Sequence, residues 1–270
     1  MPGAPSAPFA PTPAPAAVGG AATRPRVWLV DLDELARAGD CERVLSEREL
    51  HRADRFAVAR LRRHFVARSA ALRLVLGAAL DVDPRAVPLA TGALGKPRLA
   101  GLSELSFNLS HCEGAAAIAL TTAGAIGVDV ECAGRVDEQH LIASRFFDAS
   151  EAETIAGLPR GLAESAFLRC WTAKEAVLKA SGVGLTQPLR DVVVDADPRR
   201  PLRLRRVPAP LQPRDWTVHA RGLPGRLVLA TAVTAPRVPP PTVRRLDAAV
   251  ALRSCAVRSS RRRRPSPPDR

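Results

Sequence analysis

The sequence predicts an α+β protein in which helices lie on small sheets. Two long segments repeat apolar residues at helical spacing, as Phe65, Leu72 and Leu76 do in one of them. Several short runs of small and β-branched residues are bounded by glycine-containing turns, which is typical of strands. A mixture of this kind indicates helices packed on sheets around a common core.

The expected elements follow one another along the chain with glycine or proline between many of them. Helices are expected at 46–56, 60–80 and from Glu164 to Ser181, the last ended by Gly182 and Gly184. Strands are expected from Arg26 to Leu32 and at 106–111, 115–120, 124–131, 191–196, 216–221 and 226–233.

Both ends of the chain have a composition that disfavours packing. Residues 1–24 are rich in proline, alanine and glycine, and residues 238–270 contain PPP and RRRR, so we expect a disordered lead and a disordered basic tail. The folded part is then expected to span residues 25–237.

The charge of the chain is strongly positive but unevenly spread. The formal net charge is +13, and the segment from Pro239 onward holds nine Arg against two Asp. A moderately basic body favours anionic ligands or acidic partners. Nucleic acid is not the expected partner, because aromatic residues make up only 4% of the chain and tyrosine is absent.

Cysteine usage and hydropathy indicate a cytoplasmic protein. The five cysteines are odd in number, widely spaced and free of CxxC pairs, so we expect them to be reduced thiols. The N-terminal stretch lacks the continuous apolar segment of a signal peptide, and no stretch has the length and apolar character of a membrane span.

The stretch GVDVE, residues 127–131, places two acids inside an expected buried strand. Side chains alternate along a strand, so Asp129 and Glu131 share one face while Val128 and Val130 share the other. Two like charges placed in this way repel each other unless a cation lies between them. An exposed strand edge or a salt-bridged pair would account for the same pattern.

The helix AESAFLRCWTAKEAVLKAS carries a third unusual acid. Glu175 falls within the apolar stripe that Phe167, Trp171 and Leu178 form. An unpaired buried carboxylate would cost several kcal/mol. Together with the two strand acids, Glu175 would complete a set of hard oxygen ligands suited to Mg²⁺.

Several basic or polar side chains are candidates for binding a phosphate group. Lys179 lies one helical turn after Glu175 and could neutralise a phosphate oxygen, although such pairs are often weak surface bridges. Ser110 and His111, at the end of a short strand, could surround an anion. A Ser/His hydrolase is less consistent, because adjacent strand residues point to opposite faces and no GxSxG motif is present. Further basic candidates, each also compatible with a solvated surface, are Arg48, His51, Arg62, Arg63, His64, Lys96 and Arg98.

Four of these segments resemble one known family. FNLSH, GVDVE, RFF and WTAKEAVLKASGVGL occur in the order and approximate spacing of the 4′-phosphopantetheinyl transferases of the surfactin-synthetase-activating type. The similarity runs from about Val27 through Leu185, extends to Val233 and excludes both tails. GVDVE followed about 40 residues later by WTAKEAVLK is a specific signature.

The resemblance implies a fold and an activity. The fold would be two similar α/β lobes, residues 25–125 and 126–237, in a pseudo-twofold arrangement with the active site in the cleft between them. The activity would be Mg²⁺-dependent transfer of the phosphopantetheine arm of coenzyme A to a serine of an apo acyl or peptidyl carrier protein, with release of adenosine 3′,5′-bisphosphate. Mn²⁺ could replace Mg²⁺, and a monomer is expected.

The resemblance also implies roles for individual residues. Asp129, Glu131 and Glu175 would hold the metal, and Lys179 would contact the diphosphate. Ser110, His111, Lys96 and Arg48 would lie around the adenosine 3′-phosphate, joined by Arg63 or His64. The family usually has an arginine at the position of His64, which is a departure from the pattern.

The chemistry of the transfer is compatible with these residues. Attack by a serine oxygen on the β-phosphate needs charge neutralisation, in-line geometry and a base. Glu175 is the expected base, acting directly or through a water. Two other functions fit parts of the sequence: a noncatalytic protein of the same fold that binds coenzyme A or a nucleotide, and a nucleic-acid-binding protein that uses the basic tail.

Overall fold

The computed structural model describes most of the chain between residues 24 and 252. The described residues are 11–12, 24–92, 96–101, 103–134, 138–182, 187–208, 211, 215–247 and 249–252.

The elements of the N-terminal half begin with a strand and a series of helices. In chain order these elements are β2 (Arg26–Asp31), α1 (Leu32–Ala38), η1 (Cys41–Val44), α2 (Glu47–Asp54), α3 (Ala59–Leu80), η2 (Pro84–Ala86), β3 (Leu89–Thr91), β4 (Pro97–Leu99), β5 (Ser106–Cys112) and β6 (Ala115–Thr121).

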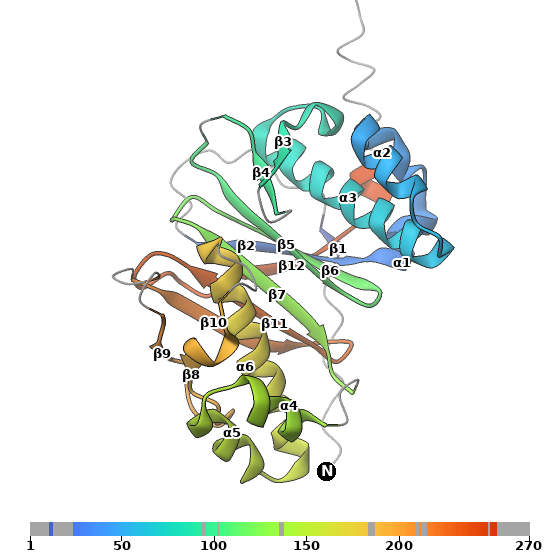
Figure 1. Ribbon diagram of the computed structural model, residues 1–270. Coiled ribbons are helices and arrows are strands. Elements are labelled where there is room, and N and C mark those ends of the chain that lie inside the picture. Colours follow the sequence, from blue (N-terminus) through green and yellow to red (C-terminus); the bar gives the residue numbers. More distant parts are fainter. Residues whose placement is uncertain are drawn as a thin grey trace, which may run out of the picture.

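The C-terminal half presents a similar order of elements. Its elements are β7 (Ile126–Cys132), α4 (Gln139–Phe146), α5 (Ala149–Ala156), α6 (Arg160–Ser181), η4 (Leu189–Asp191), β8 (Val193–Val194), β9 (Leu204–Arg206), β10 (Thr217–Leu223) and β11 (Leu227–Val233). Among the described residues, each half therefore has a strand, three α-helices, a 3-10 turn after the third helix, a two-stranded hairpin and two further strands. In Figure 1 the helices of the two halves lie at opposite ends of the molecule, with the strands between them. The α+β class is confirmed, and the twofold relation between the halves stays a prediction.

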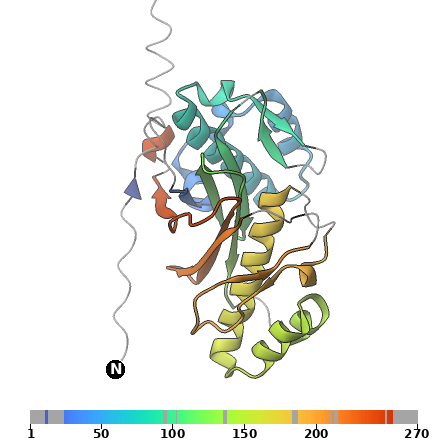
Figure 2. The same cartoon turned by 90° about the vertical axis from the view of Figure 1, so that its left-hand side faces the viewer.

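Two main sheets meet in the middle of the molecule (Figures 1 and 2). One has the order β1-β12-β2-β6-β5 and the other the order β10-β11-β7. Val27 of β2 and Ala117 of β6 pack with Val128 and Val130 of β7 in a buried core. Where β5 approaches β7, the Asn108 side-chain oxygen accepts the backbone N–H of Val128 at 2.8 Å. A side chain thus satisfies a strand N–H that no neighbouring backbone pairs with there.

The segment that follows residue 238 forms part of the fold. Strand β12 (Thr242–Leu246) pairs in parallel with β2, and Leu246 is buried. The short strand β1 (Pro11–Thr12) pairs with β12. The expectation of disorder is therefore wrong for residues 11–12 and for the start of the basic tail, because β12 pairs with β2 and β1 pairs with β12. Composition does not reveal this pairing. Residues 253–270 and most of the lead lie outside the described residues.

Smaller differences concern helices that periodicity did not reveal. The first strand ends at Asp31, whose side chain caps the N-terminus of α1, so Leu32 belongs to the helix. Helices α4 and α5 were not expected, although each has eight residues, the same length as α2. Among the described residues, no helix has both the length and the apolar character needed to cross a membrane.

Candidate active site

Strand β7 and helix α6 are in unusually close contact at Gly127. A Cβ atom at this position would lie 1.9 Å from the carbonyl oxygen of Ala176 and 2.5 Å from the backbone nitrogen of Ala180. Only glycine therefore allows the helix backbone to approach the strand this closely. Because side chains alternate along β7, Asp129 and Glu131 share the face of Gly127 and lie under α6.

Three polar side chains converge where α6 crosses β7. The Lys179 ammonium donates to Asp129 Oδ1 at 2.6 Å and to the Ser110 hydroxyl at 2.9 Å. Ser110 in turn donates to the same Asp129 oxygen at 2.8 Å. Strands β5 and β7 and helix α6 each supply one member of this cluster, so it exists only in the folded protein.

The second oxygen of Asp129 is buried and has no hydrogen-bond partner in the described part of the chain. Asp129 itself is only 2% exposed. A buried acceptor without a partner is costly and calls for an explanation, such as a bound ion.

The other two acids lie within electrostatic reach of Asp129. Burial raises the pKa of Glu131 to about 7, and the negative charges of Asp129 and Glu175 act in the same direction. Burial also raises the pKa of Glu175, with Lys179 opposing and Asp129 reinforcing the shift. The side chain of Trp171 donates a hydrogen bond to Glu131. Three acids placed this close together form a set that a cation would stabilise.

The donor set therefore fits a hard divalent cation, but its side chains are not gathered around one point. Among the described residues, no three His, Cys, Asp or Glu side chains lie close enough together to hold a metal ion. Metal binding would require Glu131 and Glu175 to turn towards Asp129. Both carboxylates end flexible side chains and are only partly buried, so rotation about their side-chain bonds is feasible.

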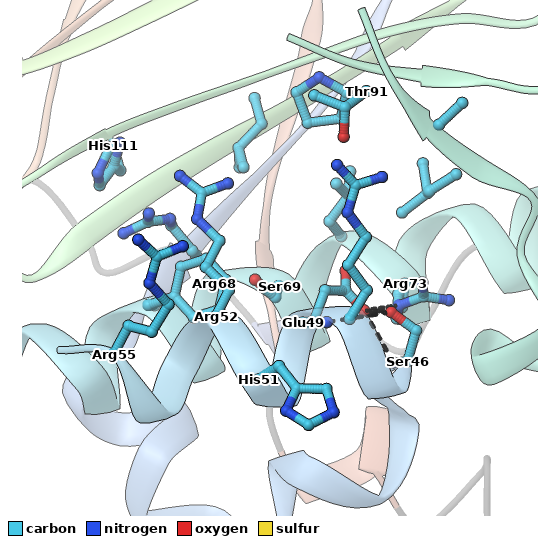
Figure 3. A pocket seen from close by; sticks show the side chains of 17 residues that line it. Ser46, Glu49, His51, Arg52, Arg55, Arg68, Ser69, Arg73, Thr91 and His111 are labelled. Atoms are coloured by element: carbon cyan, nitrogen blue, oxygen red, sulfur yellow. Dashed lines mark hydrogen bonds and ion pairs between the residues drawn. The ribbon is translucent and has the colours of Figure 1, made fainter. Parts of the chain in front are cut away.

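A cavity of about 600 Å³ lies between α2, α3, the β3–β4 hairpin and β5. Arg48 of α2 lines it. Figure 3 shows Arg52 of α2, Arg55 at the end of this helix, Arg68 of α3 and His111 of β5 around the same cavity. The acid that lines it, Glu49, is already paired with Arg73. The cavity thus carries an excess of positive charge and suits a multiply charged anion.

Burial and neighbouring positive charges lower the pKa of two basic groups of this cavity. The pKa of Arg68 falls to about 10, chiefly through burial and also through the charge of Arg52. His111 is open to the cavity on one side, yet the surrounding protein and the charges of Arg68 and Lys179 lower its pKa to about 4. His111 is therefore neutral at pH 7 and would offer an anion a neutral N–H donor. It follows Ser110 on β5, so the strand connects the cavity with the Asp129 cluster.

The structure brings together most of the residues that the sequence singled out. Asp129, Lys179 and Ser110 are in direct contact, while Arg48 and His111 line the arginine-rich cavity. Three further basic candidates from the sequence lie in different places. His51 lines the same cavity and Arg98 lines another cavity. Arg62 forms ion pairs with Glu42 and Asp54.

Three residues expected at the phosphate site lie outside the arginine-rich cavity. Lys96 donates to the backbone carbonyl of Lys179, and burial lowers its pKa, helped by the charge of Lys179. It lines a second cavity of about 490 Å³ rather than the arginine-rich one. His64 is buried and contacts Asp33 Oδ1 at 2.9 Å, and Arg63 is exposed. Neither of these two residues lines the arginine-rich cavity.

Sequence reasoning missed Arg52, Arg55 and Arg68. A signal for the first two was present, because Arg48, Arg52 and Arg55 follow the i, i+4, i+7 spacing of one helix face. Arg68 had no comparable signal, since its role depends on how α3 packs against α2.

Comparison with known proteins identifies the family of this chain. The family model of the 4′-phosphopantetheinyl transferase superfamily matches residues 125–232. The 4′-phosphopantetheinyl transferase HetI of Nostoc sp. is 36% identical over 187 residues, which cover 68% of this chain and 78% of the relative. A putative 4′-phosphopantetheinyl transferase of Synechocystis sp. is 32% identical over 64% of this chain and 70% of its own. The Sfp enzyme of Bacillus subtilis is 29% identical over 44% and 51%, respectively. The chain therefore belongs to the 4′-phosphopantetheinyl transferase superfamily.

Proposed function

We propose that this protein transfers the 4′-phosphopantetheine group from coenzyme A to a serine of an apo acyl or peptidyl carrier protein. Adenosine 3′,5′-bisphosphate would be released. The observation that carries the proposal is the position of the Asp129–Lys179–Ser110 cluster beside an arginine-rich cavity. A cation-binding acid set and an anion-binding cavity joined by β5 match a substrate with a diphosphate and a separate phosphate.

In this mechanism the arginine-rich cavity holds the adenosine 3′-phosphate. Arg48, Arg52 and Arg68 would neutralise its charge, and His111 would donate a hydrogen bond. The diphosphate would then extend along β5 towards Lys179, which would exchange its bond to Asp129 for a phosphate oxygen. Ser110 would supply a second donor there.

The acids Asp129, Glu131 and Glu175 would hold a Mg²⁺ or Mn²⁺ ion on the diphosphate. When bound, the ion supplies charge neutralisation at the oxygens of the scissile phosphate. Glu175 would accept the proton of the attacking serine, directly or through a water. Lys179 would offset the charge that develops on the leaving phosphate.

The test is an intact-mass measurement on an apo carrier protein incubated with coenzyme A and Mg²⁺. The proposal requires the mass of one phosphopantetheine group to appear on the carrier, and it requires Asp129→Ala and Glu175→Gln to abolish this gain. Glu153→Gln, an exposed acid on α5, is the matched control and is expected to react at the wild-type rate. Binding of coenzyme A without modification of any of several carriers would instead indicate a noncatalytic binding protein.

A further inference from the structure

Each half of the molecule contains an ion pair with a buried cation at the same place in its fold. Lys174 is the fifteenth residue of the 22-residue helix α6, and Arg73 is the fifteenth residue of the 22-residue helix α3. Their partners, Glu151 and Glu49, each occupy the third position of a short helix with a capping box. The same arrangement therefore ties the long helix of each half to the short helix before it.

In the C-terminal half, Lys174 is completely buried and all three of its donors are used. The ammonium donates to Glu151 Oε2 at 2.6 Å, to the carbonyl of Leu189 at 3.1 Å and to the carbonyl of Val192. Glu151 also accepts the backbone N–H of Val194 at 2.9 Å. One side chain of α6 is thus fixed to α5 and to the turn that follows α6 in the fold.

In the N-terminal half, Arg73 makes equivalent contacts. Its Nε donates to Glu49 Oε2 at 2.6 Å, and a terminal nitrogen donates to the carbonyls of Pro84 at 2.9 Å and Arg85 at 3.0 Å. Glu49 also accepts the N–H of Ser46 at 2.8 Å (Figure 3). The pair therefore connects α3 with α2 and with the turn after α3.

Each pair lies next to a different part of the proposed active site. Lys174 immediately precedes Glu175 on α6. Glu49 lies between Arg48 and Arg52, which line the arginine-rich cavity. The tip of a side chain lies some 5–6 Å from the helix axis, so rotating α6 by about 20° would move it by about 2 Å. This is enough to move the Glu175 carboxylate away from Asp129.

Stability alone is a weak explanation for these pairs. Removing two charges from water is costly, and replacing a buried ion pair by neutral side chains of similar volume is often neutral or stabilising. The pairs do fix the orientation of a helix, because Lys174 can make all of its contacts in only one orientation of α6.

We propose that the two pairs are positioning devices with separate tasks: Glu151–Lys174 sets the orientation of Glu175 and Lys179 over β7, and Glu49–Arg73 sets the orientation of the α2 arginines in the cavity. This inference rests on the proposed function. It assigns the first pair to metal binding and turnover, and the second pair to recognition of coenzyme A.

The test uses double variants that remove both charges of a pair. Lys174→Met with Glu151→Gln and Arg73→Met with Glu49→Gln avoid a lone buried charge, and glutamine still accepts the capping N–H bonds. Each variant serves as the matched control of the other. The measurements are the melting temperature, kcat and KM for coenzyme A, and Mn²⁺ binding followed by electron paramagnetic resonance with coenzyme A present and no carrier.

The proposal expects the two variants to fail in different ways. The Lys174/Glu151 variant should bind Mn²⁺ and turn over about 10- to 100-fold less well, as is usual when residues that orient metal ligands are changed. Its KM for coenzyme A should stay within about threefold of the wild type. The Arg73/Glu49 variant should show a KM for coenzyme A raised about tenfold or more, with Mn²⁺ binding at saturating coenzyme A unchanged.

Two results would overturn the proposal. One is that both variants lose melting temperature while Mn²⁺ binding, kcat and KM remain at wild-type values, which would mark the pairs as purely structural. The other is that both variants change all parameters together. A wild-type protein that binds neither Mn²⁺ nor coenzyme A and modifies no carrier would overturn the proposed function as well, and this outcome is distinguished by the wild-type control.

Discussion

Replacing Gly127 by alanine tests whether the close approach of α6 to β7 builds the site. The new methyl group would lie 1.9 Å from the Ala176 carbonyl oxygen, whereas ordinary van der Waals contact begins at 3.4 Å. Helix and strand must therefore separate by about 1.5 Å along this line. Because the atoms that the new methyl group would meet are backbone atoms of α6, no flexible side chain can move aside to relieve the contact.

The size of the effect follows from this displacement. Overpacking of a core by one methyl group costs about 2–3 kcal/mol when backbone must shift, which lowers the melting temperature of a chain of this size by roughly 5–10 °C. A displacement of more than 1 Å at Glu175 and Lys179 can reduce turnover by about 100-fold. We expect both effects in one variant.

The assay combines urea denaturation with the rate of carrier modification measured at a temperature where the variant is folded. Gly161→Ala is the matched control, because Gly161 lies on the same helix and an added Cβ would meet nothing within 4 Å. That variant should be neutral or more stable by up to about 1 kcal/mol and fully active. Wild-type stability and turnover in Gly127→Ala would refute the reasoning that this glycine places α6.

Three further predictions concern pH, recognition and the end of the chain. The pKa of Glu131 rises from 4.5 to about 7 on folding, so the folded state holds more protons than the unfolded state between these values, and the metal-free protein loses stability as pH rises through this window. The shift corresponds to at most about 3 kcal/mol of folding free energy, reduced to about 1–2 kcal/mol by partial exposure. Glu131→Gln should therefore raise the melting temperature at pH 7.5 but not at pH 4.5. An equal gain at both pH values would contradict this. Arg52→Ala should raise KM for coenzyme A about tenfold or more and leave KM for dephospho-coenzyme A nearly unchanged, whereas Arg63→Ala should change neither KM. Steady-state kinetics with both substrates checks this. An equal rise in KM for both substrates would show that Arg52 does not contact the 3′-phosphate. Deleting residues 253–270 should leave stability and transfer intact, whereas deleting 238–270 removes β12 and should lower the melting temperature; circular dichroism decides, and identical melting curves would mean that β12 contributes nothing to the fold.

The long elements and the acid pattern could be predicted from local spacing. The alternation in GVDVE and the position of Glu175 in the apolar stripe depend only on the periods of strand and helix, which the sequence displays directly. The i, i+4, i+7 spacing of Arg48, Arg52 and Arg55 likewise predicts that these arginines share one helix face. For these features the face of a residue follows from its place in the chain.

Other features depended on contacts between distant segments. The ordering of β12 requires the edge of β2, more than 200 residues earlier, and composition alone favoured disorder. His64 stands where the family usually has an arginine, and the structure pairs it with Asp33 on α1. Arg68 gains its place in the cavity only because α2 packs across α3.

The sequence by itself determined the α+β class, the shared face of Asp129 and Glu131, and the acid on the later helix, because these follow from local periodicity. Only the tertiary structure decided that the helix meets the strand, that Lys179 contacts Asp129, and that five arginines line one cavity. The physical reason is that such meetings depend on close packing between segments far apart in the chain. At Gly127 the missing side chain permits a contact that no local pattern records.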